Sequence, residues 1–116
     1  MFIAPKTTDL LLQEAKSENL YPKLLDQINK DFNLANEPVD FPKSTKPDEL
    51  KVQLHEKIYR LIQQKFAEYL NLLYIIDVSE EQVKSLDGSD LLELSKEVTF
   101  LILKREWQKV WFRNRF

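Results

Sequence analysis

The sequence predicts an all-α protein, an antiparallel helical bundle of three to four main helices built on one long central helix. Apolar residues recur at spacings of three and four along most of the chain, which is the period of an amphipathic helix. The 116 residues include one glycine, too few for the many tight turns of a β-protein. An apolar content of 43% and a charged content of 31% are typical of one globular domain, here residues 1–116.

The N-terminal part of the chain is predicted to form helix before the first proline-rich segment. Thr7 can cap a short helix over residues 10–15. A second helix is expected over about residues 19–35, because its apolar residues repeat at helical spacing and Pro22 is tolerated in a first turn. Residues 7–35 could form these two helices or one kinked helix.

A proline-containing strap is predicted between the N-terminal helix and the central helix. Pro38 and Pro42 lie within residues 36–44, and two prolines so close together exclude a continuous helix. Val39 and Phe41 alternate with a charged residue, which favours an extended chain with one apolar side. We therefore expect the strap to cross the surface of the bundle and to bury Phe41.

The central helix is predicted to run from Thr45 to Ile76. Thr45 and Asp48 form a variant of the capping box at its start, and Pro47 falls in the first turn. Apolar residues follow at helical spacing, and neither glycine nor proline interrupts them. At the α-helical rise such a helix would be roughly 45 Å long. An apolar stripe of this length must be covered by other helices, from this chain or from a second copy.

A short helix is predicted after the central one. Ser79 begins a capping box in its standard form, with Gln82 three residues later. This helix should end before Asp87 and Gly88, where the chain's single glycine is expected to take the left-handed conformation of a C-cap. The brief connection that results should turn the following helix back on the central one.

The last helix is expected over about residues 90–113, antiparallel to the central helix. Ser89 or Asp87 is expected to cap it. Nearly every residue from Val98 to Leu103 is apolar, and a helix that is apolar all round is a buried one. Residues 98–102 also have the composition of a β-strand, but no nearby segment offers a strand to pair with.

We expect a protein that is not an enzyme and binds no cofactor or metal. His55 is the only histidine and cysteine is absent, so neither a two-histidine metal site nor a catalytic triad is indicated. His55 itself is expected at the solvated edge of the central helix. One glycine is too few for a glycine-rich phosphate loop. A ligand pocket between helices is a further possibility; its expected rim is Tyr59, Tyr69, Tyr74 and Trp107.

The sequence favours a cytoplasmic protein that does not enter a membrane. The longest apolar runs are far too short to span a bilayer. The N-terminal residues do not have the charge and apolar pattern of a signal peptide, and the lack of cysteine fits a reducing compartment. A net charge of −2 gives no global attraction to nucleic acid or anionic lipid.

The C-terminal segment supplies the candidate interaction site. Residues 77–97 hold seven acidic residues against two lysines, a net charge of −5, whereas residues 104–116 carry +4. Arginine and aromatic residues are typical of binding hot spots. The predicted C-terminal patch consists of Lys104, Arg105, Trp107, Lys109, Trp111, Phe112, Arg113 and Arg115, with Phe116 beside it. We predict an interaction module that self-associates as a homodimer, the −5 segment of one copy facing the +4 segment of the other.

The alternative is nucleic-acid binding through the same basic and aromatic residues. Residues 110–115, Val-Trp-Phe-Arg-Asn-Arg, are similar to the end of the homeodomain recognition helix, where a Trp-Phe pair precedes a base-reading asparagine. The resemblance covers six residues, and the family's first helix and tight turn have no counterpart in register here. Asn114 is therefore given no role in DNA recognition, and nucleic acid is the less favoured partner.

Overall fold

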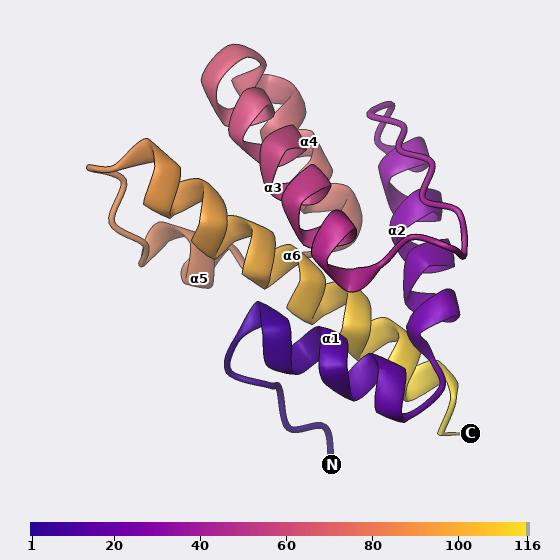
Figure 1. Cartoon of the computed structure of the whole chain (residues 1–116). Coiled ribbons are helices and arrows are strands. Elements are labelled where there is room, and N and C mark those ends of the chain that lie inside the picture. Colours follow the sequence, from indigo (N-terminus) through magenta and orange to yellow (C-terminus); the bar gives the residue numbers. More distant parts are fainter. Residues whose placement is uncertain (116) are drawn as a thin grey trace.

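The computed structural model describes residues 1–115, which form six helices and no strand. The helices are α1 (Thr8–Ser17), α2 (Tyr21–Leu34), α3 (Pro47–Gln64), α4 (Phe66–Ile76), α5 (Glu80–Lys84) and α6 (Leu91–Arg113) (Figure 1). The predicted all-α bundle is confirmed. Residues 98–102, for which a strand was the alternative, lie within α6. No helix in the described part of the chain has both the length and the apolar character that crossing a membrane requires.

The central helix of the bundle is α6. It packs against each of the other five helices, and Figure 1 shows it crossing the molecule diagonally between α3 and α1. Val98 and Ile102 lie on one side of α6, Leu103 and Trp107 lie on the opposite side, and all four are fully buried. The prediction that the segment from Thr45 occupies the centre was wrong, because α6 is the helix whose apolar residues extend round most of its circumference.

The predicted helix over residues 45–76 is two helices, separated at Lys65. Lys65 has φ −140° and ψ 61°, which interrupts the helical backbone, and α4 then returns alongside α3 (Figure 1). The longest dimension of the molecule is 37 Å, shorter than the roughly 45 Å of an unbroken helix. The break lets the second half bury Tyr69, Leu72 and Ile76 against the same subunit. It also gives five helices of ten residues or more among residues 1–115, rather than three to four.

A buried carboxylate outside α3 and α4 binds a lysine of α3 and the lysine at the break between these helices. Glu37, in the strap, is 5% exposed. Its carboxylate lies 3.1 Å from Lys65 Nζ and 3.2 Å from Lys57 Nζ. Burial alone would raise the pKa of Glu37, but the hydrogen bonds and positive charges of the two lysines outweigh it and lower that pKa. The strap thus links α3 to Lys65, the N-cap of α4.

The strap itself follows the prediction. Phe41 is 5% exposed and packs in the core. Asn29 of α2 fastens it at both backbone groups, since Asn29 Nδ2 donates to Phe41 O at 3.0 Å and Phe41 N donates to Asn29 Oδ1 at 2.9 Å. These paired bonds satisfy the backbone of a segment that lacks secondary structure.

The predicted antiparallel packing of the last helix is confirmed for α3 and α6. His55 of α3 meets Ser95 of α6, and one turn away Lys51 and Thr99 line a common depression. Residue numbers therefore rise on one helix as they fall on the other. His55 is half-buried at this edge, close to its expected position.

Two of the predicted N-caps are confirmed by side-chain hydrogen bonds. Thr7 accepts from Leu10 N and Ser79 from Gln82 N, as expected. The expected caps Thr45 and Ser89 are wrong. Thr45 Oγ1 donates to Pro42 O, which leaves Lys46 as the N-cap of α3, and Asp90 rather than Ser89 or Asp87 caps α6.

Three residues other than glycine adopt the left-handed backbone conformation, and the single glycine does not. Asn19, Asn36 and Asp77 have φ values of 59°, 59° and 69°, whereas Gly88 does not take a positive φ, contrary to expectation. The short helix ends at Lys84, so Gly88 lies beyond its C-cap. Asn19 separates α1 from α2, which resolves residues 7–35 into two helices.

Replacing Asn36 tests the cost of this backbone conformation. Asn36→Ala is expected to lower the free energy of unfolding by about 1 kcal/mol, because a Cβ without a polar group disfavours positive φ. Asn36→Gly should match or exceed the wild-type stability. Urea unfolding followed by circular dichroism measures both. Equal stability of the alanine and glycine variants would contradict the positive φ of Asn36.

Candidate interaction surface

The predicted C-terminal patch is divided between the core and the surface. Trp107 is fully buried, and its Nε1 donates to Glu14 Oε2 of α1 at 2.6 Å. Trp111 is half-buried and Phe112 is 42% exposed. Both pack against Phe2, with ring centroids 5.5 and 6.2 Å away. Phe116 lies outside the described residues.

The basic residues of the C-terminal patch are engaged within the subunit. Three ion pairs are Arg105 with Asp77 at 3.0 Å, Lys109 with Asp31 at 2.8 Å and Arg115 with Glu18 at 2.6 Å. Arg113 Nη1 donates to Gln27 Oε1 at 2.8 Å, and the Lys104 ammonium lies 5.9 Å from the ring centroid of Phe100. Much of the +4 charge expected to face a second copy is therefore balanced by carboxylates of the same chain.

A different surface is left apolar, on α4. Phe66, Leu70 and Tyr74 are 55, 49 and 78% exposed, and they are spaced four residues apart, so they form one stripe on one helix. We call these three residues the α4 stripe. Its neighbours on the helix surface, Ala67 and Asn71, carry no charge. A contiguous exposed apolar patch on a small domain is a common mark of a binding surface.

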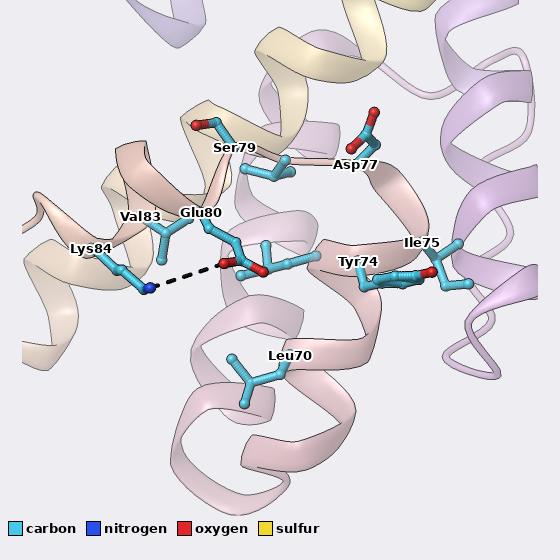
Figure 2. A pocket seen from close by; sticks show the side chains of 10 residues that line it. Leu70, Tyr74, Ile75, Asp77, Ser79, Glu80, Val83 and Lys84 are labelled. Carbon is cyan, nitrogen blue, oxygen red and sulfur yellow. Dashed lines mark ion pairs between the residues drawn. The ribbon is translucent and has the colours of Figure 1, made fainter.

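A groove runs beside the α4 stripe, between α4 and α5. Its cavity volume is about 870 Å³. Figure 2 shows Leu70 and Tyr74 on α4 across from the α5 segment that carries Val83. Glu80 and Lys84 pair at the rim at 3.9 Å (Figure 2). The lining is completed by Leu73, Ile75, Asp77, Val78 and Ser79. An apolar groove with a polar rim is the usual form of a site that takes an apolar side chain.

The α4 stripe was not singled out from the sequence, although its residues were visible there. They were counted among the apolar residues that a continuous central helix would bury. In α4, Tyr69, Leu72, Leu73 and Ile76 form the buried face, and the stripe is a second apolar strip that adjoins it. Residues 66–76 contain more apolar residues than one helical face can hold, and this excess was the signal in the sequence for a second apolar surface.

A buried pair of carboxyl groups joins α2 to α6. Glu106 is 0% exposed, and neither carboxyl oxygen accepts a hydrogen bond from any described residue. Burial, and then the adjacent Asp31 carboxylate, raise the pKa of Glu106 to about 9. A protonated Glu106 can donate its proton to Asp31, which resolves the apparent lack of partners. Glu106 is thus neutral at physiological pH.

Asp31 carries the negative charge of this pair. Burial would raise its pKa, but hydrogen bonds from Glu106, Lys109 and Gln27 outweigh that effect and lower it. Lys109 Nζ lies 2.8 Å from Asp31 and 3.4 Å from Glu106. Asp31 and Lys109 therefore form a salt bridge, and the neutral carboxyl group of Glu106 lies beside it. Its enclosure between α2 and α6 suits it to holding two helices together rather than to reacting with a substrate.

His55 and Ser95 lie within hydrogen-bond distance, a pairing that the sequence did not reveal. Nε2 of His55 is 2.7 Å from Ser95 Oγ. The Ser95 hydroxyl also lies 2.8 Å from Leu92 O, so its single proton can go to Leu92 O or to His55, and the tautomer of the imidazole decides which. Ser95 is also fully buried. The pair therefore links α3 to α6.

The predicted aromatic pocket does not form. Trp107 and Tyr69 are core residues, at 0 and 3% exposure, while Tyr74 is mostly exposed and is the only one of the four that lines the α4–α5 groove. Tyr59 is half-buried on α3. Among residues 1–115, no three His, Asp or Glu side chains converge in a way that could hold a metal ion.

Comparison of this chain with protein-family models, with curated proteins and with solved structures found no match.

Proposed function

We propose that this protein is a non-enzymatic helical interaction module that self-associates through the α4 stripe. This proposal is carried by one observation: Phe66, Leu70 and Tyr74 are 55, 49 and 78% exposed beside an apolar groove. Exposed fractions of this size correspond to roughly 400 Å² of apolar surface on three side chains. A standard interface buries about 800 Å² on each partner, so the α4 stripe would supply about half of that area and the surface around it would have to supply the rest.

The reason for self-association differs from the one drawn from the sequence. The apolar stripe of α3 is covered inside the subunit, and Arg105, Lys109 and Arg115 are paired with the chain's own carboxylates. Support for a second copy now comes from the α4 stripe, which is uncharged and apolar. A cytoplasmic location remains part of the proposal, supported by the cysteine-free composition.

Replacing Leu70 with glutamate should abolish association. The substitution sets a carboxylate in the middle of the α4 stripe, and burying an unpaired charge is strongly unfavourable. We expect sedimentation velocity to find a dimer for the wild type and a dissociation constant raised at least about 100-fold for Leu70→Glu, equivalent to some 3 kcal/mol. Because the stripe is uncharged, wild-type association should persist at moderate salt.

Leu10→Glu is the matched control for this experiment. Leu10 on α1 is 51% exposed, against 49% for Leu70, so both substitutions add one charge at an equally exposed leucine. The control should remain dimeric. A wild-type protein that sediments as a monomer at every concentration would remove the proposal, as would equal weakening by both substitutions.

Nucleic-acid binding remains the second candidate, through Lys104, Arg105, Lys109, Arg113 and Arg115. It draws less support, because three of these cations already have carboxylate partners within 3.0 Å. Binding to phosphates would have to replace these pairs and would weaken steeply with salt. Filter binding at low salt distinguishes the two candidate functions. Retention of DNA or RNA is expected only if the protein binds nucleic acid.

A further inference from the structure

We infer that two copies pair α4 against α4 in opposite directions around a two-fold axis at Leu70, with Phe66 of each copy filling the α4–α5 groove of the other. This arrangement rests on the self-association proposed above and specifies how the two surfaces fit. It also assigns an occupant to a groove that is otherwise open to solvent.

The order of residues in the α4 stripe is the first observation. Along α4 the stripe is aromatic, leucine, aromatic, with Leu70 midway between Phe66 and Tyr74. It therefore has the same chemical character in both directions. In a two-fold interface one patch meets a copy of itself, so residue i contacts residue j while j contacts i. With the axis at Leu70, Leu70 meets its own counterpart and each Phe66 meets a Tyr74.

The position of the groove is the second observation. Leu70 and Tyr74 belong both to the α4 stripe and to the groove wall. A partner's Phe66 placed opposite Tyr74 therefore lies at the groove entrance, across from Val83 (Figure 2). Val78 also lines the groove. Anchors of this kind, an aromatic side chain in an apolar pocket near the centre of an interface, carry much of the binding energy in protein complexes.

The charges at the two ends of α4 permit this antiparallel pairing. One end carries Lys65, which is paired with Glu37 at 3.1 Å. The other end carries Asp77, which is paired with Arg105 at 3.0 Å. Antiparallel pairing sets one locally neutral end beside the other, so like charges are not brought together. The C-terminal patch takes no part in this contact, which separates the arrangement from the charge-paired dimer expected from the sequence.

Single cysteines test the arrangement directly, because the natural chain contains none. A disulfide forms only when the two Cα atoms come within about 7 Å. Under mild oxidation, Leu70→Cys should give a disulfide-linked dimer as the major species. Phe66→Cys and Val83→Cys should each stay unlinked when oxidised alone. An equimolar mixture of these two variants should form the mixed dimer.

Leu10→Cys, an equally exposed site away from α4, sets the background of collisional cross-linking. Circular dichroism and sedimentation of each reduced variant establish that it is folded and associated. If Phe66→Cys links to itself, the helices are not paired as inferred. If the reduced Leu70→Cys variant sediments as a dimer but does not link, the inferred axis is wrong while self-association stands. If the wild-type protein is monomeric at every concentration, the proposed function and this arrangement fail together.

Discussion

Replacing Glu106 with glutamine is expected to raise the free energy of unfolding by about 3 kcal/mol at pH 7. In the unfolded chain Glu106 ionises near its ordinary pKa of 4.5, whereas the folded chain keeps it protonated up to about pH 9. Between these values the folded state binds the extra proton, so wild-type stability falls as the pH rises. Glutamine can still donate to Asp31 but has no proton to lose, so the variant should be more stable and should lose this slope.

Urea unfolding at several pH values between about 3 and 8.5 measures the effect. The fall in stability at low pH should be retained in Glu106→Gln, because it comes from other groups. The pKa values of Asp31 and Glu37 are lowered on folding, so their contribution is present above their unfolded pKa values and is lost as the pH falls. A glutamine variant that is less stable than the wild type at pH 8, or that keeps the wild-type slope, would show that Glu106 is ionised in the folded protein.

Truncating Trp107 to alanine should cost about 3–5 kcal/mol of stability, the range for a buried aromatic residue. Trp107 is fully buried against α1, and its loss would also leave Glu14 Oε2 without the indole hydrogen bond. For a domain of this size such a cost approaches the total stability, of about 5–15 kcal/mol. Chemical unfolding followed by circular dichroism is the appropriate measurement, because tryptophan fluorescence changes with the substitution itself.

Trp111 provides the matched comparison on the same helix. It is half-buried, its ring 5.1 Å from Phe112 and 4.2 Å from the Arg115 guanidinium. Trp111→Ala should therefore cost no more than about 1 kcal/mol. If Trp107→Ala does not fold, Trp107→Phe keeps most of the packing and should remain folded with a loss of about 1 kcal/mol from the hydrogen bond. Equal effects of alanine at both tryptophans would contradict the assignment of Trp107 to the core.

The two tryptophans have different environments that the sequence did not predict. Trp107 and Trp111 are four residues apart and have similar basic neighbours, so the sequence placed both in one patch. Their environments differ because α1 covers the first, while Phe2 packs at the edge of the second. No pattern within α6 specifies which neighbours arrive from more than ninety residues away. The ion pairs that engage the patch also join distant residues, 28 apart for Arg105 with Asp77 and 97 apart for Arg115 with Glu18.

The sequence by itself determined the helical class, most element boundaries, the caps at Thr7 and Ser79, and the burial of Phe41. These follow from interactions over a few residues or from apolar periodicity, both of which can be read along the chain. Only the tertiary structure decided that the helix breaks at Lys65, that α6 is central, and that Glu106 faces Asp31. Each of these depends on which distant surface covers a given face. Phe66, Leu70 and Tyr74 are exposed because no surface formed by residues 1–115 covers them.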